Sequence, residues 1–318
     1  MRWQDQRRST NVEDQRGAGG GFGGPGGLGG GGMRLPIGGR GGIGIVGLVV
    51  ILGLSYFLGI DPTTLLDGSG GNVAITQQQG SYQTGPNAGG AGANMGAGQQ
   101  NAAVTDQMKD FVSAVLGSTE DTWQKLMPQL GTQYTDPTLV LFSGGIQSAC
   151  GFAQTAMGPF YCPADQKVYI DLAFYKELRD RLGAPGDFAQ AYVIAHEVGH
   201  HVQTLLGITQ KVDSMRDQLS PEQQNQLSIM VELQADCFAG VWANNANKNT
   251  HLLEQGDVES GLNAAAAVGD DRLQRETQGY VVPESFTHGT SAQRVRWFTK
   301  GLETGDPRQC DTFNASQL

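Results

Sequence analysis

The chain has 318 residues, of which 48 are glycine, and its formal net charge at pH 7 is −10. An acidic chain without clusters of basic residues excludes nucleic acid as an expected partner. Two Gly-rich stretches, 17–32 and 68–103, cannot bury enough apolar surface to offset the entropy of ordering. We therefore predict a disordered tail over residues 1–40, a flexible linker over 61–103 and one globular domain over 104–318.

Residues 43–60, IGIVGLVVILGLSYFLGI, form an uncharged apolar run. At ~1.5 Å per residue the run nearly spans a ~30 Å hydrocarbon core, so we assign residues 41–60 to a transmembrane helix. A buried core helix is disfavoured because the flexible sequence on both sides offers nothing to pack against. A cleaved signal peptide is disfavoured by the long N-terminal stretch and by the lack of a small-residue cleavage site after the run.

The charges that flank this run predict its orientation. Arginines precede it and two aspartates, Asp61 and Asp67, follow it. The positive-inside rule then places the N-terminus in the cytoplasm. We expect a single-pass protein of the inner (plasma) membrane, with its globular domain in the periplasm or outside the cell.

The chain has four cysteines, and none lies in a Cys-x-x-Cys pair that would indicate a zinc knuckle. An even number on the exported side suggests two disulfides. We favour Cys150–Cys162, which are near in sequence, and hence Cys237–Cys310. Free buried thiols are the alternative, because a pairing cannot be deduced from sequence.

The globular domain is predicted to be α+β and predominantly helical, with a small sheet. A capping-box pattern at Asp187 and Gln190 begins one helix, and Ser220 with Pro221 and Gln223 begins another. The predicted strands are residues 138–142 and 167–170. The predicted helices are residues 105–116, 118–127, 172–182, 187–207, 221–245, 258–274 and 291–302.

The helix predicted over 187–207 contains His196-Glu197-Val198-Gly199-His200. Positions i and i+4 lie one turn apart on the same helix face, so both imidazoles can bind one zinc ion. Glu197 lies beside them, where it can take a proton from a metal-activated water. His201 points ~100° away from His200 and is predicted to be a packed neighbour rather than a ligand.

The helix predicted over 221–245 contains a second pair at i and i+4, Glu232 and Asp236. A catalytic zinc takes three protein ligands and keeps one position open for water. We predict Glu232 as the third ligand and Asp236 as the acceptor for the second ring nitrogen of a zinc-bound histidine. A solvated helix face is the alternative, but the apolar flanks of both acids indicate a buried helix.

The two motifs, AHEVGHHVQ and ELQADCFAG, resemble the gluzincin class of zinc metallopeptidases. With the late segment THGTSAQRVRWF, the chain is similar over nearly its whole length to the bacterial neutral zinc metallopeptidase family. That resemblance implies a zincin-like helical domain with a small sheet beside the active-site helix, a Zn²⁺ cofactor and hydrolysis of peptide bonds in a protein or peptide substrate. Membrane anchoring by a single span also agrees with it.

Related gluzincin peptidases place a histidine in a comparable late segment, which makes His288 the candidate donor to the negative charge that develops on the scissile carbonyl. A surface loop histidine is the alternative. Arg294 is predicted to pair with an acid near the site or with solvent. Asp270 and Asp271 are expected to face solvent or to cap a turn.

Peptidases of this class bind substrate as an added strand on a sheet edge. Residues 158–161 or 168–170 could form that edge. Two other functions remain as alternatives. One is a membrane-anchored scaffold with a structural zinc, which the intact Glu197 disfavours, and the other is a zinc amidase that acts on the cell wall.

Overall fold

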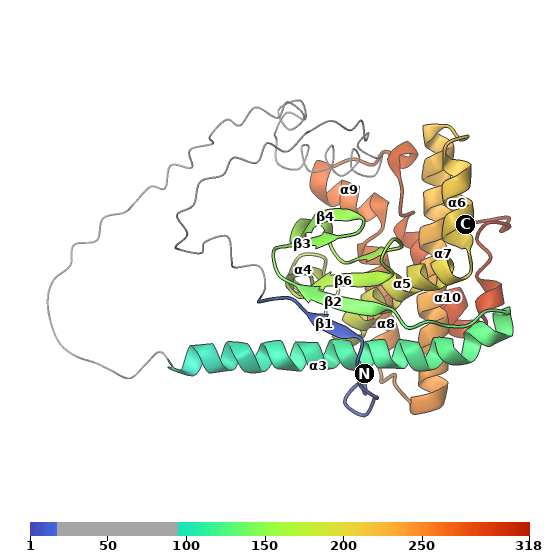
Figure 1. Cartoon of the computed structure of the whole chain (residues 1–318). Helices are drawn as coiled ribbons and strands as arrows, with labels where there is room; N and C mark the ends of the chain where they lie inside the picture. The colour runs from blue at the N-terminus through green and yellow to red at the C-terminus, as the bar shows by residue number, and fades with distance from the viewer. Residues whose placement is uncertain (18–94) are drawn as a thin grey trace, which may run out of the picture. The chain divides into compact units, whose positions relative to one another are not determined.

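The computed structural model describes residues 1–17 and 95–318, which belong to one compact unit. Its strands form two small sheets that lie beside a larger group of helices (Figure 1). The fold of the described residues is therefore α+β and predominantly helical, as predicted. The helix predicted over 41–60 and residues 61–94 of the linker predicted over 61–103 lie outside the described residues, whereas residues 95–103 belong to a helix, α3.

The larger sheet has four strands in the order β1-β2-β6-β5. Strands β1, β2 and β6 run parallel, and β5 is antiparallel to β6 at one edge. The central strands read TLVLF and KVYID and are almost wholly buried, as expected for parallel strands covered on both faces. The strand bounds are β1 Val12–Asp14, β2 Thr138–Phe142, β5 Phe160–Cys162 and β6 Lys167–Asp171, with a separate hairpin of β3 Gly145–Ser148 and β4 Gly151–Gln154.

Two helices, α5 and α7, pass through the centre of the helical group, and most of their apolar side chains belong to the main core. The large buried side chains Trp123, Phe188, Phe238 and Trp242 fill that core. The helix bounds are α3 Met95–Leu126, α4 Ala173–Asp180, α5 Asp187–Leu205, α6 Ile208–Arg216, α7 Pro221–Thr250, α8 Asp257–Ala267, α9 Asp270–Gln278 and α10 Ser291–Thr304. Single 3₁₀ turns lie at Met127–Leu130, Thr155–Met157, Pro283–Ser285 and Pro307–Gln309.

Helices α7 and α10 touch through their backbones at a pair of glycines. A Cβ atom at Gly240 would lie 2.1 Å from the Phe298 carbonyl oxygen, and one at Gly301 would lie 1.9 Å from the Cys237 carbonyl oxygen. Both distances are far below van der Waals contact, so only glycine permits this approach. The contact fixes α10 against α7 and thereby places Arg294, on α10, beside the acids of α7.

Two predictions of helix bounds were wrong because a glycine makes a close long-range contact that the sequence does not reveal. Residues 105–127 are not two short helices, because α3 continues through Gly117. That glycine gives the N-terminal segment room, since a Cβ atom there would lie 2.5 Å from the Arg7 carbonyl oxygen. Conversely, residues 258–274 form two helices, α8 and α9, that break at Gly269, where the backbone of Ser291 leaves no room for a side chain.

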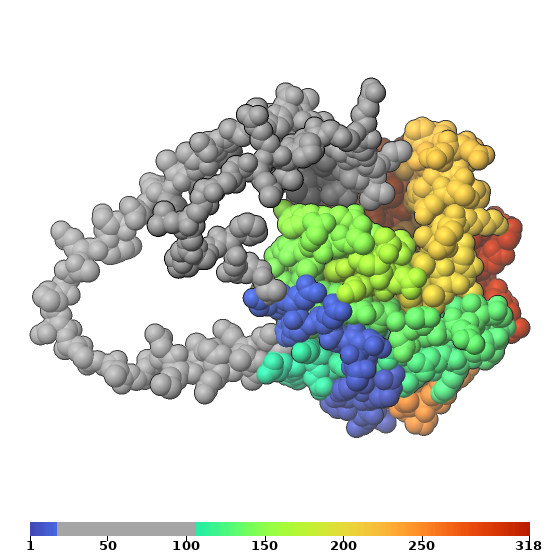
Figure 2. Space-filling view, viewed as in Figure 1, coloured from blue at the N-terminus to red at the C-terminus, as the bar shows by residue number. Residues whose placement is uncertain are grey.

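Residues 1–17 are part of the domain, which corrects this part of the disordered tail predicted over residues 1–40; residues 18–40 lie outside the described residues. Strand β1 pairs with β2, and Trp3 is 5% exposed in the main core. The Trp3 indole donates a hydrogen bond of 3.0 Å to Asp187, which is the first residue of α5 and does not act there as a side-chain cap. Figure 2 shows this segment, in blue, packed against α3 and the sheet.

The predicted membrane topology is wrong. Among residues 1–17 and 95–318, no helix is long and apolar enough to cross a bilayer. Moreover, β1 and β2 share one sheet, so the N-terminus and the domain lie on the same side of any membrane. A single crossing at residues 41–60 would separate them. The prediction of an inner-membrane, single-pass protein with a cytoplasmic N-terminus and an exported domain is therefore withdrawn.

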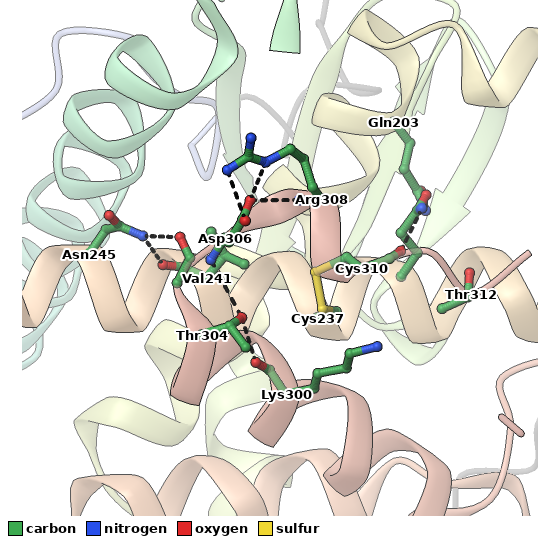
Figure 3. Close-up of a disulfide and its surroundings, with 12 residues drawn as sticks. Gln203, Cys237, Val241, Asn245, Lys300, Thr304, Asp306, Arg308, Cys310 and Thr312 are labelled. Carbon is green, nitrogen blue, oxygen red and sulfur yellow. Dashed lines mark hydrogen bonds and ion pairs between the residues drawn. A yellow bond between two sulfur atoms is a disulfide. The ribbon is translucent and has the colours of Figure 1, made fainter. Parts of the chain in front are cut away.

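Both predicted disulfides are confirmed. Cys150–Cys162 joins the β3–β4 hairpin to β5. Cys237–Cys310 joins α7 to the C-terminal segment, as the yellow bond in Figure 3 shows. The second bridge spans 73 residues and holds the Cys310 backbone against α7, close to the site described next.

Candidate metal centre

Helix α5 carries His196, Glu197 and His200 on a stretch whose other side chains are almost all buried. The helix begins after Gly186 and ends before Gly207, two glycines whose positive φ departs from helical geometry. His196 and Glu197 are 7% and 8% exposed, and His200 is partly exposed. The i and i+4 spacing predicted from the sequence is therefore realised on a buried helix.

Helix α7 crosses α5 at Gly199, the fourth residue of the pentapeptide. A Cβ atom at Gly199 would lie 2.9 Å from the Ala235 carbonyl oxygen, so the two backbones are nearly in contact. Ala235 lies between Glu232 and Asp236 along α7. The close crossing therefore brings both carboxylates next to the two histidines on either side of Gly199.

Ligand-type atoms of His196, His200 and Glu232 all lie within 4.8 Å of one another. The Glu232 carboxylate is 3.2 Å from His196 Nε2 through one oxygen and 3.5 Å from His200 Nε2 through the other. Two ligand atoms that bind one tetrahedral zinc are ~3.4 Å apart. The donor set of two imidazoles and one carboxylate, with these separations, fits a single zinc ion.

The carboxylate of Asp236 lies at the centre of a buried hydrogen-bond network behind His196. It accepts hydrogen bonds from His196 Nδ1 at 2.8 Å, from the Tyr192 hydroxyl at 2.5 Å and from Arg294 at 2.8 and 2.9 Å. Asp236 is 0% exposed and Arg294 is 3% exposed. Asp236 thus contacts the second ring nitrogen of His196, and Arg294 pairs with an acid of the site rather than with solvent.

The electrostatics of this network favour positive charge at the centre. Burial alone would lower the pKa of His196, but Asp236 and Glu232 raise it to about 10. Burial raises the pKa of Asp236, whereas Arg294 and His196 lower it by more, so the net pKa lies below its ordinary value. A bound cation would neutralise the same carboxylates that otherwise stabilise a proton on His196. This agrees with a donor set that fits a metal ion.

His200 is held by a different group, an amide. Its Nδ1 lies 2.9 Å from Gln203 Oε1, and Gln203 is 1% exposed. Gln203 is on the same helix three residues later and therefore on the same face. The sequence interpretation missed Gln203, although this spacing could have indicated it, and it also missed Tyr192, one turn before His196.

Glu197 lies next to the ligand cluster without belonging to it. Its side chain is buried, and burial raises its pKa above the ordinary value although His196 and His200 partly oppose this. A buried carboxylate with a raised pKa accepts a proton more readily than an exposed one, which is the property expected of a general base.

His288 follows α9, on a loop that packs against α7 beside Glu232. The loop is held by Asp270, whose carboxylate accepts hydrogen bonds from the backbone nitrogens of Thr287, His288 and Gly289 at 2.8, 2.7 and 3.0 Å and contacts His288 Nδ1 at 3.1 Å. Asp270 and Glu232 raise the pKa of His288, despite the opposing effect of desolvation, and its side chain is half exposed. Of the two roles predicted for Asp270, exposure to solvent is excluded because Asp270 is 9% exposed, and capping of a turn agrees with its bonds to three successive backbone nitrogens.

His201 is a packed residue, as predicted, with 0% exposure. Its Nε2 lies 2.6 Å from the Thr135 carbonyl oxygen, which can only accept, so Nδ1 accepts the hydrogen bond from the Tyr161 hydroxyl at 3.1 Å. Tyr161 belongs to β5, which is therefore tied to α5. Of the two candidate edges, β5 lies at the edge of the sheet, whereas β6 has neighbours on both sides.

Comparison with known families agrees with this geometry. The model of one family, described as "Putative neutral zinc metallopeptidase", matches residues 1–313. The chain belongs to this family. The match begins at the first residue, in keeping with an N-terminal segment that is part of the fold.

Curated relatives are similar over long stretches. The chain is 48% identical over 318 residues to the YpfJ protein of Escherichia coli strain K12. The aligned region covers 99% of this chain and 100% of that protein. It is 44% identical over 217 residues to the Rv2575 protein of Mycobacterium tuberculosis strain H37Rv, covering 65% of this chain and 71% of the relative. Among solved structures, none matches the chain.

Proposed function

We propose that this chain is a zinc-dependent endopeptidase in which His196, His200 and Glu232 hold the metal. The observation that supports the proposal best is the convergence of these side chains from two helices, with the second ring nitrogen of each histidine already hydrogen-bonded. When bound, zinc would supply a Lewis acid that activates water and polarises a carbonyl. Membership of the family supports zinc and peptide hydrolysis.

Glu197 is proposed as the general base. It is buried beside the ligands and is not one of the three clustered ligand groups, so its carboxylate can accept a proton from water and return it to the leaving amine. His288 is proposed to donate to the negative charge on the scissile carbonyl oxygen. Its half-exposed ring and the Asp270 contact that holds its loop agree with that role.

The substrate is proposed to be a protein or peptide segment in extended conformation. Such a segment can pair with the edge of β5 that no described strand occupies, and Tyr161 ties this strand to the active-site helix through His201. Backbone hydrogen bonds along a sheet edge bind many sequences, because side chains contribute only through the pockets they meet.

The test is to incubate the purified protein with a denatured protein mixture and to compare wild type with Glu197→Gln. Glu222→Gln, on the exposed start of α7, is the matched control. We expect cleavage by wild type and by the control, sensitivity to a chelator, and a loss of at least ~100-fold in Glu197→Gln. Absence of cleavage by all three proteins with zinc retained would favour the scaffold, and release of muropeptides without protein cleavage would favour the cell-wall amidase.

A further inference from the structure

The second ring nitrogen of His200 is the start of a chain of buried amides that runs across α7. His200 Nδ1 is 2.9 Å from Gln203 Oε1. Gln203 Nε2 donates to Gln234 Oε1 at 3.1 Å, and Gln234 Nε2 donates to the Cys310 carbonyl oxygen at 2.9 Å. Both glutamines are at most 5% exposed. The chain connects the candidate metal centre to the disulfide that anchors the C-terminal segment.

Two backbone carbonyls set the direction of every hydrogen bond in this chain. A carbonyl oxygen can only accept. The Cys310 carbonyl therefore requires the NH₂ group of Gln234 to point toward it, which turns Gln234 Oε1 toward Gln203. The Val231 carbonyl, 2.8 Å from Gln203 Nε2, makes the same demand on Gln203.

With its NH₂ group directed at Val231 and Gln234, Gln203 can offer only its oxygen to His200. The hydrogen of a neutral His200 must therefore lie on Nδ1, and the lone pair must lie on Nε2, the atom that faces Glu232 at 3.5 Å. We infer that Gln203 and Gln234 are positioning residues that select the tautomer of His200 in which Nε2 can bind a metal. This inference rests on the proposed metal centre but not on peptide cleavage.

The arrangement differs from the one at His196. There the acceptor is a carboxylate with its own ion pair to Arg294, whereas at His200 it is a neutral amide whose orientation depends on two partners. An isolated amide could rotate and present its NH₂ group to the ring instead. The carbonyls of Val231 and Cys310 together oppose this rotation, and the Cys237–Cys310 bridge holds the second of these acceptors against α7 (Figure 3).

Zinc affinity, measured by competition with a chromophoric chelator on the full chain, tests the inference. Gln203→Met keeps the side-chain length but removes the acceptor, and we expect affinity to fall by about 10–100-fold. Gln203→Glu keeps the acceptor, so affinity should stay within about threefold of wild type even if thermal stability falls. Gln234→Met should give an intermediate loss, because Val231 still orients Gln203.

Gln224→Met is the matched control, since Gln224 lies on α7 with Gln234 and its amide, like that of Gln203, donates to a backbone carbonyl, but away from the site. Its zinc affinity should equal that of wild type. Equal affinities for Gln203→Met and Gln224→Met would overturn the inference. So would a Gln203→Glu variant as weak as Gln203→Met, because packing rather than the acceptor would then be responsible.

A direct measurement on wild type keeps the test independent of folding of the variants. Long-range ¹H–¹⁵N NMR spectra of the histidine rings report which nitrogen carries hydrogen. With His200 neutral, with or without zinc, we expect the hydrogen on Nδ1; hydrogen on Nε2 would refute the inference. A protein with this tautomer that cleaves no peptide would retain the inference and lose the proposed function.

Discussion

Gly199 lies against Ala235 where α5 crosses α7, with space for a hydrogen atom but not for a methyl group. The contact joins the helix that carries the two histidines to the helix that carries Glu232 and Asp236. Separation of the helices at this point would draw the Glu232 carboxylate away from both imidazoles. The site therefore depends on the absence of one side chain.

Gly199→Ala tests this dependence. Alanine favours a helix over glycine by ~1 kcal/mol, but the clash is with a backbone carbonyl that cannot rotate away, and overpacking costs about 1–3 kcal/mol. We expect a net loss of stability by chemical denaturation and weaker zinc binding. Gly17→Ala is the control, because a Cβ atom there meets nothing within 4 Å. Stability equal to or above wild type, with full zinc affinity, would contradict the close crossing.

Asp236→Ala should lower both the stability of the fold and the affinity for zinc, although alanine is compatible with the helix. It leaves the buried guanidinium of Arg294 without its counter-charge, which costs about 3–5 kcal/mol, and it removes the acceptor of His196, which costs about 10–100-fold in zinc affinity. Urea denaturation and metal titration measure the two effects separately.

The double variant Asp236→Ala with Arg294→Met provides the control for that experiment. Because it removes both charges, it should regain part of the stability, whereas zinc affinity should stay low since His196 still lacks its acceptor. If the double variant is no more stable than Asp236→Ala, the ion pair is not the source of the loss.

Trp3→Ala tests whether the N-terminal segment is part of the domain. The indole is 5% exposed, packs edge-to-face on Phe111 with ring centroids 5.5 Å apart and donates to Asp187. Removal of a buried tryptophan costs about 3–5 kcal/mol. Trp3→Phe keeps most of the buried area but loses the hydrogen bond. Loss of the bond should cost only about 1 kcal/mol, in addition to the small cost of the smaller ring. Unchanged thermal unfolding of Trp3→Ala would show that the segment is not docked.

The two disulfides should differ in their contribution to stability. The loop-entropy relation assigns about 4.4 kcal/mol to a loop of the Cys237–Cys310 separation, 73 residues, and about 2.8 kcal/mol to one of the Cys150–Cys162 separation, 12 residues. Paired Cys→Ala variants of each bridge, compared by denaturation under oxidising conditions, measure the difference. A larger loss for Cys150–Cys162 would contradict this order.

Local patterns were sufficient for some features. The i and i+4 spacing placed His196 and His200 on one face, and the capping box at Ser220, with Gln223, marks the start of α7 where it was predicted. Strand β2 was predicted with its observed bounds because it is a short apolar run between polar residues. These features depend on neighbours within one or two turns of the chain.

Long-range contacts explain the failures. Gly117 suggested a helix break, but it serves the approach of Arg7, more than a hundred residues earlier in the chain. Strand β1 was missed because its three residues are stabilised by pairing with β2 and not by any local pattern. The sequence left open whether Asp270 faces solvent or caps a turn, because its partners, the backbone nitrogens of residues 287–289, cannot be recognised from side-chain types.

The amino-acid order alone determined the donor types of the candidate centre and their spacing along each helix, because a helix repeats every ~3.6 residues whatever surrounds it. Only the tertiary structure decided which way each donor faces. The crossing at Gly199 determines the separation of the two helices. Arg294 balances the charge of the carboxylate that contacts His196. The carbonyls of Val231 and Cys310 determine the orientation of the amides behind His200. Those contacts join residues far apart in sequence, where no periodicity relates them.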